Sequence, residues 1–487
     1  MSGEQRTGLR TTQRQAPSAG LGAPGPATTK LGQVALIVAV ATIGGFMFGY
    51  DSGVINGTQG GLRTAFKLGE AGLGLAVAAI LVGCAVGAFL GARIADRAGR
   101  RSVLMASALL FILSAVGAGA AVSAEVFMAF RFIGGLGVGA ASVTSPLYIS
   151  EVSPARFRGR LSSLQQVMII CGLTGAFLAN YALAHAAGGS TAVLGGVTAW
   201  RWMFLAQVVP ASVFLMSLLL IPESPRYLVL RGQDAAALVV LKRLLGEGND
   251  QQKLDEIRAS LDADHKPRLS DLIDRTSGRV RSIVWAGLIL AVFQQLIGIN
   301  VVFYYGSTLW QAVGFSEADA LKTNILSGGI SVCSCLVAIG LIDQVGRKPM
   351  LLIGAAGMAI ALGVVALAFS TGHLEEGKLL LPHPAALAAF VAANAYTALF
   401  NFSWGPVMWV MLGEMFPNQI RGSGLAVAGF AQWIANFAIT ASFPLLATSL
   451  GLAATYGFYC LSALVSFFLV RSWIVETRGR ELEAMRG

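Results

Sequence analysis

The sequence predicts an all-α membrane protein with twelve spanning helices, arranged as two related bundles of six. Three observations predict this fold class. Of the 487 residues, 55% are hydrophobic and 12% are charged, which is half the charged fraction of roughly 25% in soluble proteins. The apolar residues gather into twelve long runs, and two motifs of the first half recur in the second. Lipid is therefore the solvent for most of the chain, which excludes a soluble multi-domain assembly.

Each apolar run is long enough to cross a bilayer. A helix needs about 20 apolar residues to span ~30 Å of hydrocarbon, because lipid offers the backbone no hydrogen bonds. The predicted spans of the N-terminal bundle (33–221) are 34–56, 72–94, 102–122, 126–149, 161–184 and 201–221. Those of the C-terminal bundle (282–473) are 282–304, 322–342, 349–370, 385–412, 421–446 and 451–473.

Three segments lie outside the bundles. Residues 1–32 are rich in Gly, Pro, Ser, Thr and Gln and lack the apolar core of a secretory signal, so we expect a disordered tail. Residues 222–281 are polar and carry 11 of the 35 Lys and Arg residues. They form either a solvated connector or a set of short helices that brace the cytoplasmic face. Residues 474–487 are expected to form a short cytoplasmic tail.

The positions of the cations predict the orientation, because Lys and Arg favour the cytoplasmic side of short loops. With both termini in the cytoplasm, 29 of the 35 Lys and Arg residues fall in cytoplasmic segments. The net charge of +10 therefore reflects membrane topology, and we expect no nucleic-acid partner. A short first outer loop and abundant Ala and Gly favour a bacterial inner membrane.

Two motifs recur at equivalent places in the two halves. The segment 91–101, which ends D-R-A-G-R-R, returns as 340–348, and E-x-x-P-x-x-x-R-G at 151–159 returns at 414–422. Such a six-plus-six duplication relates the bundles by an axis along the membrane normal and places the ligand site between them. It also makes a functional monomer the default expectation.

The repeated loops concentrate guanidinium groups at helix ends, where they can pair with carboxylates and carbonyls. We interpret them as a gating network that latches the two bundles while the outside is open. A plain topology anchor would also need cations, but it explains neither the acidic residue nor its recurrence at Asp343. The predicted network comprises Asp96, Arg97, Arg100, Arg101, Glu151, Arg158, Glu223, Asp343, Arg347, Glu414, Arg421 and Glu476.

Together with these loops, three further motifs resemble the sugar porter family of the major facilitator superfamily. They are P-E-S-P-R at 222–226, Q-Q-L-I-G-I-N at 294–300 and G-P-x-x-W at 405–409. The similarity extends from about residue 34 to 478, and the pattern is most similar to bacterial proton-coupled xylose symporters. The resemblance implies a major facilitator fold that imports a monosaccharide, a pentose or hexose such as D-xylose or D-glucose, by alternating access.

The residue types also suit a sugar. Monosaccharide hydroxyls donate and accept hydrogen bonds, as Gln and Asn amides do, and aromatic rings cover the apolar sugar face. The resemblance implies sugar contacts at Gln166, Gln294, Gln295, Asn300, Trp409 and Gln432, with an aromatic lining of Phe48, Tyr304 and Trp433. Asn436 is a further candidate from its residue type. A buried amide could instead link helices, which is worth about 0.6–2 kcal/mol.

Two positions depart from the family pattern. Ser331 stands where many glucose and xylose porters carry Asn, and Leu173 stands where the xylose symporter pattern has a second Gln. The choice between pentoses and hexoses therefore stays open.

Asp51 and Arg131 are ionisable groups at membrane depth. An unpaired charge at a helix centre costs ~2.5–3.5 kcal/mol on insertion scales, so we expect the two to pair inside a bundle. A moving Asp–Arg pair can take up and release a proton, whereas a fixed pair would be structural only. In the resembling symporters the position of Asp51 is the proton-coupling one, and passive facilitators carry an uncharged residue there. We therefore expect sugar–proton symport, with the proton as coupling ion and no cofactor.

Other functional classes fit less well. A passive facilitator would need Asp51 to be structural only, and a transporter-like nutrient sensor would need a longer signalling tail. The chain lacks H-E-x-x-H, G-x-S-x-G and clustered acidic metal sites. We therefore expect neither an enzyme nor a metal site, and the expected partners are the sugar and the lipid bilayer.

Overall fold

The computed structural model describes residues 31–153, 158–245, 250–263, 269–273, 278–375, 378–417 and 419–478. Most of the predicted N-terminal tail and residues 479–487 lie outside the described residues. Within them, twelve helical segments are long and apolar enough to cross a membrane. The predicted number of spans is therefore confirmed.

The first six spans form the N-half. Their helices are α1 (Leu31–Phe66), α2 (Glu70–Ala98), α3 (Arg100–Ala120), α4 (Ala124–Val152), α5 (Arg158–Ala187), α6 (Ala199–Ala206) and α7 (Val208–Leu220). A short antiparallel hairpin, β1 (Val193–Leu194) and β2 (Val197–Thr198), joins α5 to α6. The stretch after α7 contains α8 (Pro225–Leu230), α9 (Asp234–Leu245), α10 (Asp250–Ala263) and the 3-10 turn η1 (Leu269–Leu272).

The second six spans form the C-half. Their helices are α11 (Ser282–Leu296), α12 (Ile299–Ala312), α13 (Glu317–Val345), α14 (Arg347–Ser370), α15 (His383–Phe402), α16 (Trp404–Met415), α17 (Arg421–Ser449) and α18 (Gly451–Trp473). A second antiparallel hairpin, β3 (His373–Glu375) and β4 (Lys378–Leu380), joins α14 to α15.

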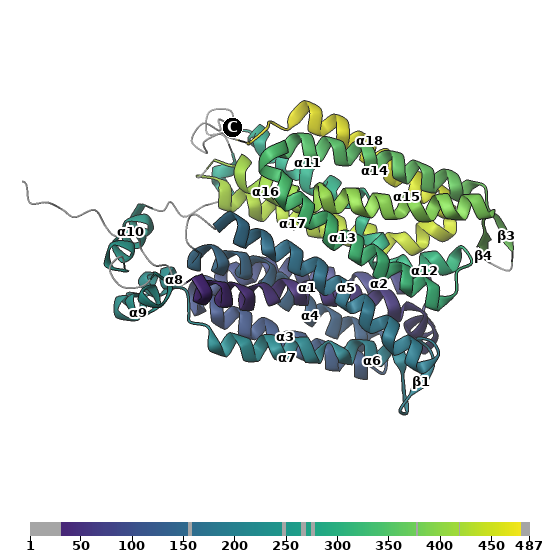
Figure 1. Cartoon of the computed structure of the whole chain (residues 1–487), viewed down its shortest axis with the longest axis horizontal. Helices are drawn as coiled ribbons and strands as arrows, with labels where there is room; N and C mark the ends of the chain where they lie inside the picture. The colour runs from purple at the N-terminus through teal and green to yellow at the C-terminus, as the bar shows by residue number, and fades with distance from the viewer. Residues whose placement is uncertain are drawn as a thin grey trace, which may run out of the picture.

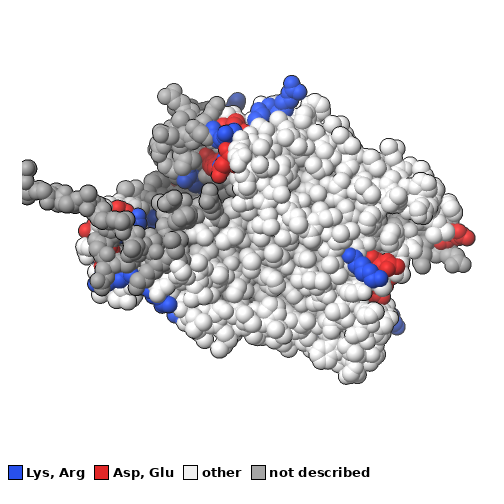
Figure 2. Space-filling model, viewed as in Figure 1, with Lys and Arg blue, Asp and Glu red and all other residues white. Residues whose placement is uncertain are grey.

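The two halves lie side by side, with α8–α10 at one end of the molecule and both hairpins at the other (Figure 1). We call these the linker end and the hairpin end. The halves meet where α1 packs on α12, α2 on α17 and α5 on α13. In Figure 2 the charged side chains lie near the two ends, and the visible flank between them is uncharged. Large apolar side chains such as Ile360 and Leu367 are mostly exposed on the flanks, as expected where lipid surrounds the protein.

Three spans are interrupted, although the sequence predicted continuous runs. Span 6 changes helix at Gln207, span 7 at Ile297–Gly298 and span 10 at Ser403. Gly298 has φ +84°, a conformation that side chains disfavour and that ends α11. The carbonyl freed at Ile297 accepts a hydrogen bond from the Tyr396 hydroxyl at 2.7 Å. Irregular backbone is therefore satisfied inside the protein, as a spanning segment requires.

Glycines set the close packing of α2 against α4. A Cβ atom on Gly135 would collide with the carbonyl oxygen of Ile80. This close approach holds α4 in the middle of the N-half, where Arg131 faces α1.

Candidate functional site

Asp51 and Arg131 form a buried ion pair between α1 and α4. Arg131 Nη1 bonds to Asp51 Oδ1, and Nη2 donates to the Asp51 carbonyl oxygen at 3.3 Å. Both side chains are almost fully buried, with 0% and 1% exposed. The Arg131 guanidinium also lies 5.6 Å from the ring centroid of Phe204. The structure thus brings together the two ionisable groups that the sequence singled out.

A tyrosine of the C-half is buried near the ion pair. Tyr304 on α12 is 4% exposed, and its side chain lies close enough to those of Ser52, Asn436 and Arg131 to interact with them. Ser52 follows Asp51 on α1, and Asn436 lies on α17. Tyr304 therefore lies between the region of α1 that holds the ion pair and a predicted sugar-binding amide.

Four of the five predicted amides of the C-half form one hydrogen-bonded cluster. Gln432 Nε2 donates to Gln294 Oε1 at 2.6 Å, and Gln295 Nε2 donates to the same oxygen at 3.2 Å. Asn300 in turn donates to Gln295 Oε1. Gln294 Nε2 donates to the carbonyl oxygen of Trp404, at the interruption of span 10, at 3.0 Å. The interruptions of spans 7 and 10 thus bring four amides from three helices into one place.

The Gln432 amide keeps one acceptor free. Its Oε1 atom is buried and has no hydrogen-bond partner among the residues that the structure describes. A buried unpaired carbonyl is costly unless a ligand or water satisfies it. This oxygen is therefore suited to accept a hydrogen bond from a sugar hydroxyl.

Two of the predicted aromatic residues contact each other between the halves. The rings of Phe48 on α1 and Trp433 on α17 contact each other across the halves, with centroids 5.8 Å apart. Gln166 on α5 is half-buried and Trp409 on α16 is 40% exposed. In the described part of the chain, neither joins the hydrogen bonds of the amide cluster.

The two departures from the family pattern have different structural settings. Buried Ser331 on α13 accepts a hydrogen bond from Asn401 Nδ2 on α15 at 3.1 Å, so a neighbouring helix supplies an amide at this place. Leu173 on α5 packs against α1, where its Cδ1 would lie 3.2 Å from a Cβ on Gly53. Leu173 thus serves helix packing, in keeping with its burial.

At the hairpin end, uncharged side chains of α1 join the two halves, which sequence reasoning missed. Asn56 Nδ2 donates to the Phe303 carbonyl at 2.8 Å, and Asn56 Oδ1 accepts from Ser307 N at 3.1 Å and from Asn324 Nδ2 at 2.7 Å. One turn later, Gln59 Oε1 accepts from Thr308 Oγ1 at 2.7 Å. Two amides three residues apart were a usable signal, but the predicted span ended at residue 56 whereas α1 runs to Phe66.

At the linker end, the predicted charged residues of the N-half form one cluster. Arg100 Nη2 pairs with Glu151 Oε1 at 3.0 Å and with Asp96 Oδ1 at 3.3 Å. The Glu223 carboxylate accepts from the backbone N–H groups of Arg100 at 2.9 Å and Arg101 at 3.1 Å, at the start of α3. An anion is favourable at such a helix N-terminus.

The C-half repeats this cluster. Arg347 pairs with Glu414 at 2.8 Å and with Asp343 at 3.0 Å. Glu476 accepts from the N–H groups of Arg347 at 3.1 Å and Lys348 at 2.9 Å. Burial raises the pKa of Glu476, but these N–H groups and those of Thr477 and Arg478 outweigh it and hold the pKa below its ordinary value of 4.5.

The remaining predicted network residues also bond within their own half. The Arg97 carbonyl accepts from the Tyr227 hydroxyl at 3.0 Å, and Arg101 Nε donates to the Leu218 carbonyl at 2.8 Å. Arg421 Nε donates to the Phe416 carbonyl at 3.3 Å. The Arg158 side chain lies outside the described residues. The predicted latch between the bundles therefore stays a prediction.

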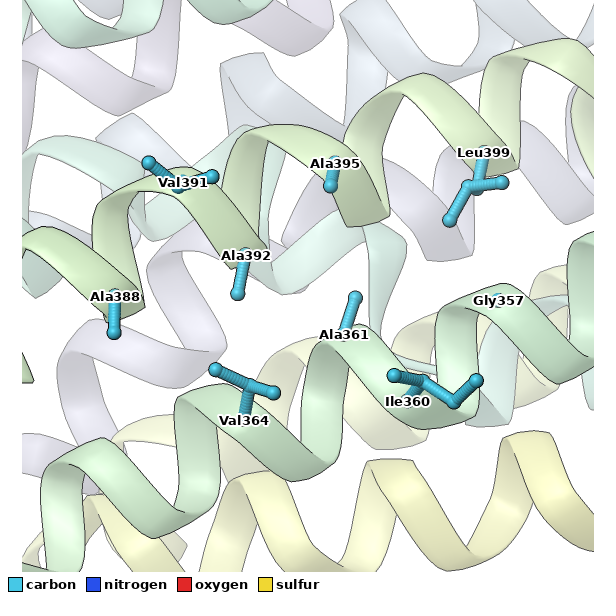
Figure 3. A pocket seen from close by; sticks show the side chains of 9 residues that line it. All are labelled: Gly357, Ile360, Ala361, Val364, Ala388, Val391, Ala392, Ala395 and Leu399. Atoms are coloured by element: carbon cyan, nitrogen blue, oxygen red, sulfur yellow. The ribbon is translucent and has the colours of Figure 1, made fainter.

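A hollow of about 470 Å³ between α14 and α15 is unsuited to sugar. Figure 3 shows it lined by aliphatic side chains and a glycine, among them Ile360, Val364, Val391 and Leu399. It offers no amide or aromatic group, and its rim carries the exposed apolar residues of the flank.

Comparison with known proteins identifies the family. The family model described as "Sugar (and other) transporter" matches residues 37–486. A glucose transport protein of Synechocystis is 46% identical over 464 residues, covering 95% of this chain and 99% of the relative. The D-xylose-proton symporter of Escherichia coli is 37% identical over 486 residues, covering 92% of this chain and 94% of the relative.

Solved structures give the same answer. A partially occluded inward-open structure of the E. coli xylose transporter superposes with a TM-score of 0.80 at 34% identity, covering 92% of this chain and all of that one. Its structure bound to 6-bromo-6-deoxy-D-glucose gives 0.76 at 35% identity, covering 93% and 98%. The chain is therefore a multi-pass membrane protein with the major facilitator fold, and it belongs to the sugar transporter family.

Proposed function

We propose that this protein imports a monosaccharide together with a proton by alternating access. The observation that carries the proposal is the buried Asp51–Arg131 pair, beside which Tyr304 of the C-half is buried. D-xylose and D-glucose are the proposed substrates. The amide cluster supports them, as do relatives that bear the names of a D-xylose-proton symporter and a glucose transport protein.

In the proposed cycle, Asp51 takes a proton from the outside, sugar binds, and the halves rock. Release of both inside lets Asp51 pair again with Arg131. Closure of the hairpin end by Asn56 and Gln59 supports assigning the present structure to the inward-facing state. The re-formed ion pair agrees with that assignment.

The proposal includes the surroundings of the protein. We place it in a bacterial inner membrane with both termini and the linker end in the cytoplasm, as a functional monomer that catalyses no chemical reaction and needs no cofactor beyond the proton. The charged clusters of the two halves are proposed to meet across the bundles when the outside is open. The abundance of cations near the linker end supports this orientation.

Replacing Asp51 by Asn tests the proposed function. The purified variant, reconstituted in proteoliposomes, is expected to lose sugar accumulation driven by a proton gradient while it retains exchange of labelled for unlabelled sugar. Asn keeps the size of the side chain but cannot carry the proton. Asp319→Asn is the matched control, because Asp319 is an exposed carboxylate that pairs with Lys322 near the hairpin end.

Accumulation by Asp51→Asn at the level of the unmodified protein would contradict proton coupling at this residue and would favour a passive facilitator. Competition of unlabelled pentoses, hexoses and inositol against one labelled sugar then identifies the substrate. Sugars that bind should compete in both the unmodified protein and the variant.

A further inference from the structure

The two oxygen atoms of the Asp51 carboxylate have different surroundings. Oδ1 is held by Arg131. Oδ2 is buried and has no hydrogen-bond partner among the described residues. A buried carboxylate oxygen without a partner is costly, and such exceptions call for a functional explanation. Oδ2 is thus the oxygen that the ion pair leaves available.

A slot beside Oδ2 is kept open by Gly134 on α4, three residues after Arg131. A Cβ atom at Gly134 would lie 3.3 Å from Asp51 Oδ2 and would collide with Ser114 Oγ on α3. Ser114 is itself 1% exposed. Two buried oxygen atoms from different helices therefore border the same small space, and only a glycine fits between them.

The helices packed around Asp51 place few titratable groups near its carboxylate. Arg131 comes from α4, the Cys84 thiol from α2 interacts with both Asp51 and Arg131, and Tyr304 comes from α12. From α6, Arg201 is engaged elsewhere, by the carbonyls of Gly119 and Ala121. Ser114 is the uncharged hydroxyl contributed by α3.

In the ion-paired state, the structure shows no hydrogen bond between the described side chains of Ser114 and Asp51. The Ser114 hydroxyl therefore does not stabilise the carboxylate anion. A serine hydroxyl can accept as well as donate. A protonated carboxyl group needs an acceptor for its O–H, and among the described residues no charged acceptor bonds to Oδ2. Ser114 Oγ is the oxygen atom placed to accept a hydrogen bond from the protonated carboxyl group.

We propose that Asp51 Oδ2 is the atom that receives the coupling proton, that Ser114 is the positioning residue that accepts the resulting O–H, and that Gly134 keeps their meeting place open. The inference rests on the proposed symport. A proton from outside water forms the O–H bond on Oδ2 and cancels the carboxylate charge, which releases Arg131. On the inside that bond breaks, the proton passes to cytoplasmic water, and the ion pair re-forms.

Ser114→Ala tests the acceptor in proteoliposomes through the external pH that gives half-maximal proton-driven uptake. Loss of one hydrogen bond to the neutral acid should move this pH by about 0.5–1 unit to the acidic side. Sugar exchange without a proton gradient should be unchanged. The substitution removes a single oxygen and introduces no clash, so the fold should be retained.

Gly134→Ala tests the slot. Its methyl group should displace Ser114 and press on Oδ2, so most proton-driven accumulation is lost while exchange persists. Gly137→Ala is the matched control, because on the same helix its Cβ would meet Ser107 O at 3.1 Å and Leu110 Cβ at 3.2 Å. Its pH profile should equal that of the unmodified protein.

An unshifted or alkaline-shifted pH profile in Ser114→Ala overturns the inference, even if Gly134→Ala fails to fold. If Asp51→Asn abolishes accumulation in that case, the proposed symport stands without Ser114. Accumulation that survives in Asp51→Asn contradicts the symport itself, whatever the other variants do.

Discussion

The charged clusters of the two halves have the same design but different burial. In both, a glycine with φ near +97° precedes an arginine whose guanidinium pairs with two carboxylates. A third carboxylate accepts hydrogen bonds from the backbone N–H groups at the start of the following helix. The matched residues are Gly99 and Gly346, Arg100 and Arg347, Asp96 and Asp343, Glu151 and Glu414, and Glu223 and Glu476. The arginine and its glutamate are 5% and 4% exposed in the N-half, against 12% and 30% in the C-half.

The difference shows that the same motif can form ion pairs of different strength in the two halves, because the burial of the paired side chains differs. Water reaches Glu414 and screens its attraction to Arg347, whereas Glu151 and Arg100 face each other in a dry site. The N-half cluster should therefore be the more sensitive to loss of a partner.

The largest expected effect follows from replacing the arginines. Arg100→Ala should lower the free energy of unfolding by about 3–5 kcal/mol, because the buried Glu151 carboxylate loses the guanidinium that pairs with it. Arg347→Ala should cost less, since water can hydrate Glu414. Thermal unfolding in detergent measures both. Arg63→Ala, which breaks an exposed pair with Glu70, is the control, with a change of about 0–1 kcal/mol. Equal losses in the two halves would contradict the burial argument.

Replacing the glycines should have a smaller effect. Gly99 and Gly346 both have positive φ with extended ψ, a conformation that is nearly restricted to glycine, so Ala at either should cost about 1–3 kcal/mol. Gly99→Ala should cost more, because its Cβ would collide with Glu223, whereas that of Gly346 would lie 2.9 Å from Glu476 Oε2. Unfolding measurements would compare them with Gly340→Ala, whose Cβ meets nothing within 4 Å. A larger loss of unfolding free energy in Gly346→Ala than in Gly99→Ala would contradict this prediction.

The smallest expected effect is the pH-dependent contribution of Glu476 to the stability of the fold. Because its pKa lies below 4.5 in the folded protein, its charged form stabilises the fold above pH 4.5, and this contribution disappears as pH falls through the folded pKa. Glu476→Gln should therefore lose about 0.3–1 kcal/mol at pH 7. At strongly acidic pH the variant and the unmodified protein should melt alike. A stability difference between the two proteins that grows on acidification would contradict the predicted direction of the pH dependence.

Much of the fold was predictable because hydrophobic length and repeated motifs are local signals. The pairing of Asp51 with Arg131 followed from the cost of isolated charges in lipid. The interruptions of spans 7 and 10 did not, because the few polar residues, Gly and Pro near Gly298 and Ser403 leave both runs hydrophobic enough to be predicted as continuous spans. The role of Asn56 also escaped, since its partners lie about 250 residues away and only the packed structure makes them neighbours.

The attachment of the linker end has a mechanical consequence. Ser224 caps α8 and also donates to Glu151, while Tyr227 bonds to the Arg97 carbonyl, and α9 contacts α1. By contrast, η1 contacts α17 of the C-half. When the bundles rock, α8 and α9 should therefore move with the N-half, whereas η1 should move with the C-half.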